Sequence, residues 1–141
     1  MIWDLLRLQR HRVRWILGGL ALAMFFSVRP ILAADLSGTW DLTCRLGDDR
    51  QIISLELIHD GSRLAGSGTI RMENTGAGVP VELRVGRVRG RDFSFSLLEI
   101  GRPGARPQYF DGSWFRNEMS GLSTGAFGAR VFRGDRRSRK R

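Results

Sequence analysis

The sequence predicts an all-β fold, a single antiparallel up-and-down barrel of about eight strands. From Asp35 onward, apolar and polar residues alternate with a period of two, which is typical of strands that bury one face. Turn-forming glycine, asparagine and aspartate residues interrupt this alternation at short intervals, and the chain contains 18 glycines but only four prolines. No stretch after Asp35 shows a sustained helical period.

The expected strands cover residues 38–45, 51–58, 63–72, 79–89, 91–100, 108–115, 119–126 and 127–133. Alternation alone defines the first two of these strands. The inward-facing apolar residues are Trp40, Leu42 and Cys44 in the first strand and Ile53, Leu55 and Leu57 in the second. Tight turns at residues 46–49 and 60–62 connect these strands to the next ones.

The third to fifth strands each carry a further signal. The third places Gly66 and Gly68 on its inward face, where they leave room for bulky neighbours or for a ligand. In the fourth, the parity of the apolar residues changes near Gly86, which predicts a β-bulge. The fifth is followed by a loop at 101–107 that contains both glycine and proline, and its length favours a lid or recognition loop. The last three strands again alternate and are joined by short turns.

The N-terminal residues 1–34 have the layout of a secretory signal peptide. Four arginines precede an apolar run of fourteen residues, 15–28, and a short exit segment ends at Ala34. The run is shorter than the roughly 20 residues that a membrane-spanning helix needs. We therefore expect cleavage near Ala34 and a periplasmic or secreted domain. The alternative is a retained anchor in the inner membrane, with the barrel outside the cytoplasm.

The net charge of +9 is concentrated at the two ends of the chain. Residues 35–132, the expected barrel domain, contain twelve basic and twelve acidic side chains, whereas residues 133–141 contain six basic residues and one aspartate. A domain that binds nucleic acid usually carries a basic face with reader side chains nearby, so we expect no nucleic-acid partner. We expect residues 133–141 to form a disordered basic tail that can contact anionic lipid at a membrane surface.

Residues 37–40, with the sequence Ser-Gly-Thr-Trp, resemble the start of the first strand in the avidins and lipocalins, the calycin-type barrels. In those families a Gly-x-Trp motif places the tryptophan across one end of the barrel. The resemblance implies a structural closure made by Gly38 and Trp40. It also implies that a basic residue of the last strand, Arg130 or Arg133, packs on the tryptophan ring by a cation–π contact.

The resemblance does not extend to a biotin site. Leu42 and Thr69 stand near the positions where an avidin-like site needs a polar residue and a tyrosine, and Trp114 is the only late tryptophan. The Thr-Asp-Tyr loop motif of lipocalins is also missing from the sequence. Biotin binding is therefore not expected.

The sequence shows no catalytic set. Residues 121–125 match the Gly-x-Ser-x-Gly nucleophile elbow, but neither a predicted helix nor a later histidine follows them. His59 is the single histidine of the expected barrel, and the expected register puts it roughly 25 Å from Cys44, too far for a dyad. We expect Cys44 to be a buried inert thiol, with intermolecular pairing as the alternative. Without clustered His and Cys residues or a cofactor motif, we expect no metal, no cofactor and no enzymatic activity.

These observations favour an exported, non-enzymatic barrel that binds a small apolar ligand or a partner protein. The candidate ligand-binding residues are aromatic side chains expected at or near the interior, namely Trp40, Phe93, Phe95, Tyr109 and Trp114. The alternative function is an accessory or structural subunit of a membrane-associated assembly, held there by a retained N-terminal helix and the basic tail.

Overall fold

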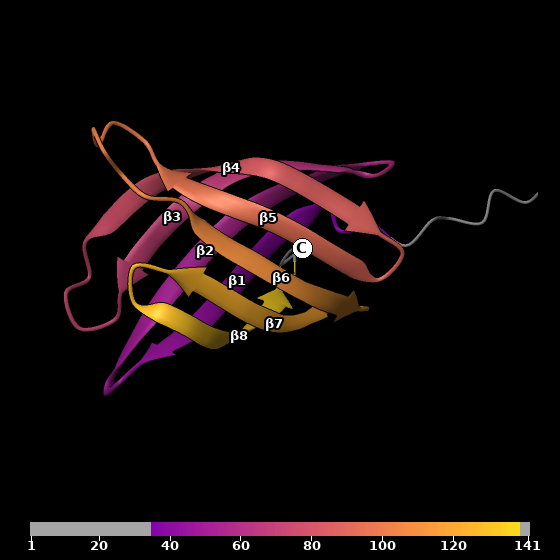
Figure 1. The fold of residues 1–141 in the computed structure, drawn as a ribbon. Coiled ribbons are helices and arrows are strands. Elements are labelled where there is room, and N and C mark those ends of the chain that lie inside the picture. Colours follow the sequence, from indigo (N-terminus) through magenta and orange to yellow (C-terminus); the bar gives the residue numbers. More distant parts are fainter. Residues whose placement is uncertain (1–34, 139–141) are drawn as a thin grey trace, which may run out of the picture. The chain divides into compact units, whose positions relative to one another are not determined.

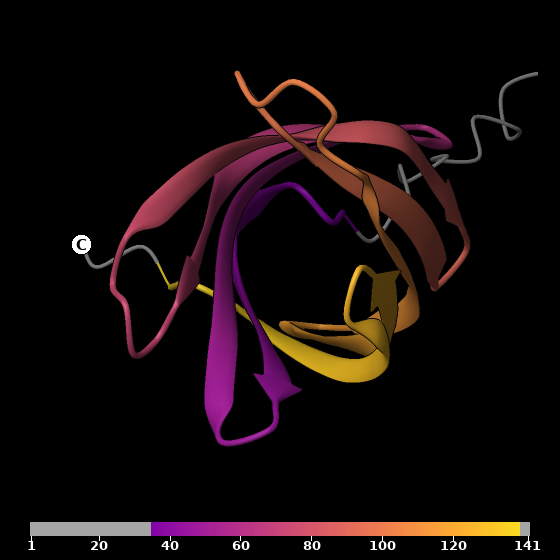
Figure 2. The ribbon, with the colours of Figure 1, turned by 60° about the vertical axis from the view of Figure 1, so that its left-hand side comes forward.

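A closed barrel of eight antiparallel strands forms the part of the chain described by a computed structural model, residues 35–138 (Figure 1). The strands are β1 (Gly38–Leu46), β2 (Asp49–Asp60), β3 (Arg63–Met72), β4 (Gly78–Arg89), β5 (Asp92–Glu99), β6 (Gln108–Phe115), β7 (Glu118–Gly125) and β8 (Gly128–Arg136). Each strand pairs with the next along the chain, and β8 returns to pair with β1, as the view in Figure 2 shows. The predicted up-and-down barrel is confirmed, because all eight predicted strands are present within a few residues of their expected bounds.

The expected signal peptide or anchor, residues 1–34, lies outside the described residues, as do residues 139–141. Within residues 35–138, no helix is long and apolar enough to cross a membrane.

Strand β8 extends past its expected end at residue 133 and closes the barrel. Its residues pair with β1 as far as Arg136, which lies opposite Trp40. Beyond the strand, the backbone N–H of Arg137 donates to the Thr39 carbonyl at 2.8 Å. The expected start of a tail at residue 133 is therefore corrected. Residues 133–137 belong to the barrel, where β1 supplies the partners that their backbone groups need.

An ion pair fixes the end of β8 to β1. The Asp41 carboxylate accepts hydrogen bonds from Arg137 Nη2 at 2.6 Å and Nε at 3.0 Å, and from Ser54 Oγ at 2.7 Å. Burial alone would raise the pKa of Asp41, but the hydrogen bonds from Arg137 and Ser54, together with the positive charge of Arg137, outweigh that effect and hold the pKa below its ordinary value.

The core lies inside the barrel and is built from alternate residues of the strands. The least exposed apolar side chains, at 1% or less, are Leu36, Trp40, Leu42, Cys44, Ile53, Leu55, Val81, Leu97, Phe110 and Phe132. On β1 and β2, the buried side chains in this list belong to residues that the period-two pattern predicted to face inward.

Inward glycines let the sheet bend tightly enough to close. A Cβ atom at Gly68 would overlap the carbonyl oxygen of Ser54 on β2, and one at Gly121 would overlap that of Asp111 on β6. Neighbouring backbones that approach so closely leave no space for a side chain. The space expected beside Gly66 and Gly68 is thus taken up by the backbone of β2, and it does not accommodate a ligand.

The expected bulge in β4 is present. The register of β4 against β5 shifts between Arg84 and Arg87, and Val85 adopts a left-handed φ of 49°. As a result the Val85 side chain points outward and is 77% exposed, one position before the parity change expected at Gly86. A bulge of this kind increases the local bend and twist of the strand.

Trp40 closes the end of the barrel at which β1 begins. Its side chain is fully buried, and its indole N–H donates to the Leu36 carbonyl at 2.9 Å. Gly38, two residues earlier, has a φ of 131°, a backbone conformation that a side chain would strain.

Arg136 provides the cation–π contact at this end. Its guanidinium carbon lies 4.8 Å from the centroid of the Trp40 ring. Arg130 and Arg133 were expected in this role, and that expectation is corrected. Because β8 continues to Arg136, the residue opposite Trp40 lies farther along the strand than either of them.

Gly68→Ala tests the role of the inward glycines. Because the added methyl group would overlap the Ser54 backbone, we expect the variant to lose about 1–3 kcal/mol of unfolding free energy, the range for overpacked sites. Gly78→Ala is the matched control, since a Cβ atom there lies 3.9 Å from the Thr69 side chain, an ordinary contact. Urea unfolding curves measure both variants, and equal stability would contradict this role for Gly68.

Candidate functional site

A layer of aromatic side chains fills the middle of the barrel. Phe93, Phe95, Phe110 and Phe132 contact one another with ring centroids 4.9 to 6.2 Å apart. Each of the four is at most 4% exposed. An eight-stranded barrel has room for its own side chains or for one small ligand, so this layer fills the centre with protein. Two predicted ligand-binding residues, Phe93 and Phe95, are therefore part of the packed core.

The other three aromatic candidates are not part of this layer, although Tyr109 lines a cavity on the outer surface together with Phe95 and Phe110. Trp40 is buried at the end that it closes, and Trp114, which is 5% exposed, lies toward the same end of β6. Tyr109 is 54% exposed on the outer surface, because the alternation along β6 turns its neighbour Phe110 inward. Within the described barrel, the five predicted residues are not brought together around one cavity.

The opposite end, which we call the mouth, carries a cluster of inward-facing polar side chains. The mouth is the end formed by the β1–β2, β3–β4, β5–β6 and β7–β8 connections, at the left in Figure 1. Gln108 Nε2 donates to Ser123 Oγ at 2.6 Å and to Gln51 Oε1 at 2.9 Å, while Gln51 Nε2 donates to Gln108 Oε1 at 3.3 Å. Gln51 and Ser123 are only 7% and 2% exposed. These hydrogen bonds satisfy buried polar groups and fix their geometry.

A cavity of about 110 Å³ lies beside this polar cluster. Its apolar lining includes Leu46, Ile70, Leu97 and Phe127. The loop after β5, predicted as a lid or recognition loop, contributes Arg106 and Pro107 to the lining. Apolar walls with a few fixed polar groups are typical of small-molecule sites.

Arg130 reaches the same cavity from β8, where it lies opposite Ser123 of β7. Its guanidinium donates from Nη2 to the Phe127 carbonyl at 3.2 Å and from Nη1 to the Arg45 carbonyl at 3.4 Å. Because a guanidinium remains protonated in folded proteins, the mouth carries a fixed positive charge.

Cys44 also lines the mouth cavity, but its thiol is not activated. The side chain is 1% exposed. Burial raises the pKa of Cys44 to about 11, although a hydrogen bond with Ser123 and the charge of Arg130 act in the opposite direction. Since the thiolate is the reactive form, the buried thiol is inert at neutral pH, as predicted.

His59 lies at the Trp40 end, where it holds the chain before β1. Its Nδ1 accepts a hydrogen bond from the Leu36 N–H at 3.3 Å, and its Nε2 lies 2.7 Å from the Gly61 carbonyl oxygen. Cys44 is at the other end of its strand, so the two residues form no dyad, as the register predicts. Among residues 35–138, no group of three or more His, Cys, Asp or Glu side chains is arranged to hold a metal ion.

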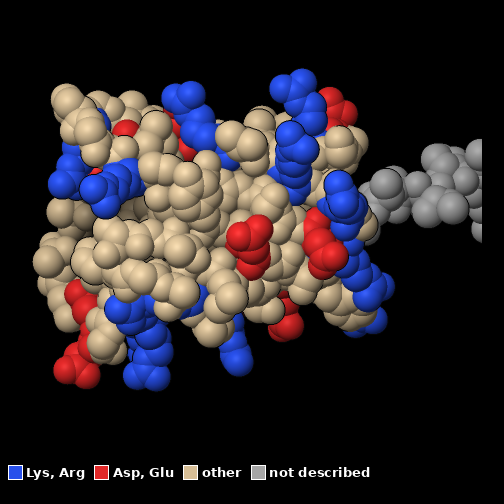
Figure 3. Space-filling model, viewed as in Figure 1, with Lys and Arg blue, Asp and Glu red and all other residues tan. Residues whose placement is uncertain are grey.

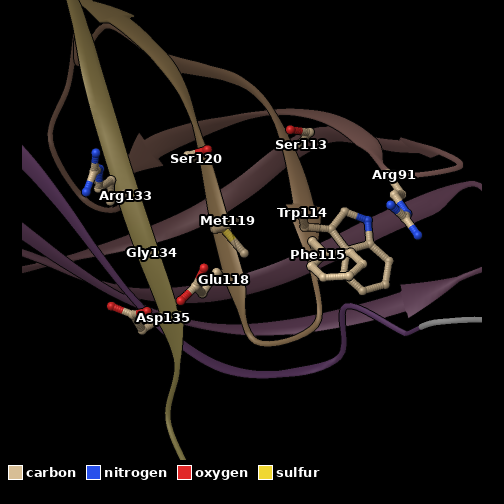
Figure 4. Close-up of a pocket in the computed structure, with 10 residues that line it drawn as sticks. All are labelled: Arg91, Ser113, Trp114, Phe115, Glu118, Met119, Ser120, Arg133, Gly134 and Asp135. Atoms are coloured by element: carbon tan, nitrogen blue, oxygen red, sulfur yellow. The ribbon is translucent and has the colours of Figure 1, made fainter.

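A second cavity, a groove of about 490 Å³, lies along β6, β7 and β8 (Figure 4). Arg91 and Arg133 line it together with Glu118 and Asp135, which are paired in the β7–β8 register. All four of these charged residues are exposed to solvent. Trp114 also lines the groove, and its buried indole N–H has no hydrogen-bond partner among the described residues. The charges of the two signs balance, so the groove has no net charge to select a small ligand.

The outer surface of β6, β7 and β8 carries exposed apolar side chains. Tyr109, Leu122 and Val131 are 54%, 54% and 65% exposed, and Leu122 lies opposite Val131 in the β7–β8 register. Figure 3 shows broad uncharged surface between the charged side chains on the face over β5, β6 and β7. Tyr109 therefore belongs to an outer surface and not to the barrel interior.

Gln51, Gln108 and Ser123 were not among the binding residues predicted from the sequence. The available signal was parity, since Gln51 shares the inward face of β2 with Ile53, and Ser123 shares that of β7 with Met119. A polar residue at an inward position of an alternating strand indicates a buried polar group that needs a partner.

The comparisons with known proteins support the fold. No protein-family model matches the chain, and no curated protein sequence is detectably similar to it. The chain is similar to a redesigned β-barrel, mFAP1, solved bound to DFHBI, with a TM-score of 0.54 and 15% sequence identity over 72% of this chain and 94% of that one. It is also similar to a de novo designed fluorescence-activating β-barrel, with a TM-score of 0.51 and 18% identity over 75% of this chain and 96% of that one. At these identities the likeness establishes a small closed β-barrel, which is the fold-level part of the expected resemblance.

The buried thiol predicts a pH dependence of stability. The pKa of Cys44 in the unfolded chain is near the ordinary value of 9.0, below the value of about 11 in the barrel. Between these two pH values the unfolded chain loses the proton first, so ionisation favours unfolding. We expect the unfolding free energy to fall as the pH rises from 9 to 11, and Cys44→Ala to lack this part of the decrease. Denaturant titrations of the wild type and of Cys44→Ala at pH 8, 10 and 11 measure this decrease in unfolding free energy. A decrease of equal size in the two proteins would contradict the prediction.

Proposed function

We propose that this protein is a binding barrel that holds a small molecule in the mouth cavity. The observation that carries the proposal is the hydrogen-bonded cluster of Gln51, Gln108 and Ser123 beside a cavity with apolar walls. Apolar side chains would fill these inward positions at lower desolvation cost, so a polar cluster there is best explained by ligand recognition. The similar designed barrel that was solved with DFHBI supports the proposal, because it holds a small molecule on the same kind of fold.

The cavity limits how much of the ligand is buried. Its volume of about 110 Å³ equals that of about four waters, at about 30 Å³ each in the liquid. The buried part is therefore a few heavy atoms, and a longer molecule would extend outward past Phe127 and the loop after β5. The walls formed by Ile70 and Leu97 favour an apolar body, in keeping with the small apolar ligand expected from the sequence.

The proposed role is binding without catalysis. Burial keeps the Cys44 thiol protonated, and the His59 ring is hydrogen-bonded at the other end of the barrel. A catalytic site would need a nucleophile and a base within hydrogen-bond reach of each other. The separation of these two groups supports a binding protein.

Hexanamide is a suitable neutral probe, because its amide can bond with the polar cluster while its chain contacts the apolar walls. At about 0.5 kcal/mol for each non-hydrogen atom, we expect a dissociation constant of about 1 mM by ligand-observed NMR. Gln108→Leu should weaken binding about tenfold, since Gln108 joins the other two polar side chains.

Tyr109→Ser is the matched control. This neighbouring residue lies on the outer surface, so the variant should bind hexanamide as the wild type does. Loss of binding in Tyr109→Ser with normal binding in Gln108→Leu would place the site on the outer surface. A wild-type barrel that binds neither hexanamide nor its charged counterpart hexanoate would remove the proposal.

We also propose, from residues 1–34, that the protein is exported and that the barrel acts outside the cytoplasm. The mass of the intact protein isolated from its native cells shows whether residues 1–34 have been removed. We expect a mature chain that begins at Asp35, whereas a chain that begins at Met1 would contradict cleavage and support the retained anchor. In that case the basic C-terminal residues would add electrostatic attraction to anionic lipid.

A further inference from the structure

We propose that the ligand of the mouth cavity carries a carboxylate group, to which Arg130 serves as the counter-ion. The inference rests on the proposed binding function and specifies its ligand class, a small monocarboxylate with an apolar body.

The charge of Arg130 has no acidic partner among residues 35–138. Four other arginines of the barrel make ion pairs with carboxylates, and Arg130 is not one of them. Glu99 is the acidic residue that lines the mouth cavity, and it is paired with Arg102 at 3.1 Å. Arg106 lines the cavity as a second guanidinium. The cavity is therefore positive, and a positive cleft with low-dielectric walls attracts anions.

Part of the hydrogen-bonding capacity of Arg130 is unused. Its two terminal nitrogens donate to backbone carbonyls, but its Nε is buried and has no acceptor within the described barrel. A buried donor without an acceptor costs free energy, and the cost is greater on a charged group. A carboxylate is the acceptor that fits best, because its two oxygens match the geometry of a guanidinium.

Arg136 provides the internal comparison. Its Nε is likewise buried without an acceptor, yet its guanidinium lies over the Trp40 ring at 4.8 Å. The aromatic face partly offsets the charge of Arg136. Arg130 has no such contact in the residues that the structure describes, so of these two arginines it is the one whose charge is available to a ligand.

Further donors stand beside Arg130. Ser123 accepts a hydrogen bond from Gln108, and its own hydroxyl hydrogen can be donated either to the Cys44 sulfur or to an acceptor in the cavity. The amide of Gln51 makes one of the two donations open to it. These groups face the same cavity as the guanidinium, so an anion there would accept hydrogen bonds from a second side as well.

The cavity favours a monocarboxylate over phosphate. A dianion would bring a second charge into about 110 Å³ of space walled by Leu46, Ile70, Leu97 and Phe127. Burying a charge without a matching partner is costly. A single carboxylate with an apolar chain satisfies both the guanidinium and the walls.

Hexanoate and hexanamide form a matched pair of probes that differ in charge at pH 7. We expect the wild type to bind hexanoate at least about tenfold more tightly than hexanamide, because hydrogen bonds to charged groups are the stronger ones. In Arg130→Gln, the preference for hexanoate over hexanamide should be lost, so that the two probes bind with about equal affinity. Arg130→Lys keeps the charge and should retain part of the preference, which tests the inference if the glutamine variant is poorly folded.

Arg133→Gln is the control, since this arginine lies on the outer face of β8 and the preference should persist without it. Equal affinity of the wild type for the two probes, or a preference that survives Arg130→Gln, would overturn the inference and leave the binding function intact. Failure of both probes to bind would instead remove the proposed function. Displacement of hexanoate by inorganic phosphate at equal concentration would overturn the monocarboxylate class.

Discussion

The narrow interior of an eight-stranded barrel is the constraint on which the structure depends, because it has room for inward side chains and little else. Gly68 and Gly121 let neighbouring backbones approach closely enough for the sheet to close. Inside the closed sheet, Phe95, Phe110 and Phe132 occupy the centre with centroid distances of 4.9 and 5.3 Å between successive rings. Inside the described barrel, free space therefore remains toward the mouth, and the ligand position that we propose there follows from packing and not from a motif.

Strand β8 places an inward-facing arginine at each end of the barrel, and the contacts of these two arginines differ. At the closed end, Arg136 lies over the fully buried Trp40 ring, and a hydrogen bond from the Trp40 indole to Leu36 completes the closure. At the mouth, Arg130 lies next to hydrogen-bonded amides, an apolar wall and open space. At the closed end the cation completes the core, whereas at the mouth the cation remains available, and this difference supports our proposal that the mouth is the binding end.

Alternation with period two predicted the strands and the inner face well, because one buried face imposes that period on every strand. The bulge near Gly86 was predictable for the same reason, since only an inserted residue reverses the parity. The end of β8 was not, because residues 133–136 have the composition of a charged tail, whereas in the barrel they pair with β7 on one side and with β1 on the other. The polar cluster at the mouth was partly predictable from the sequence, because the alternation along β2 places Gln51 on the inward face. Its hydrogen bond to Gln108, 57 residues away, depends on barrel closure.

A map of protein NMR shifts on addition of hexanoate tests the central claim most directly, since it locates the site without assuming which residues form it. A site at the mouth predicts the largest changes at the side-chain amides of Gln51 and Gln108 and at the backbone of Ser123, with the Trp40 indole signal unchanged. The largest changes at the Trp40 indole, or on the outer surface around Tyr109, would show that the mouth is not the binding end.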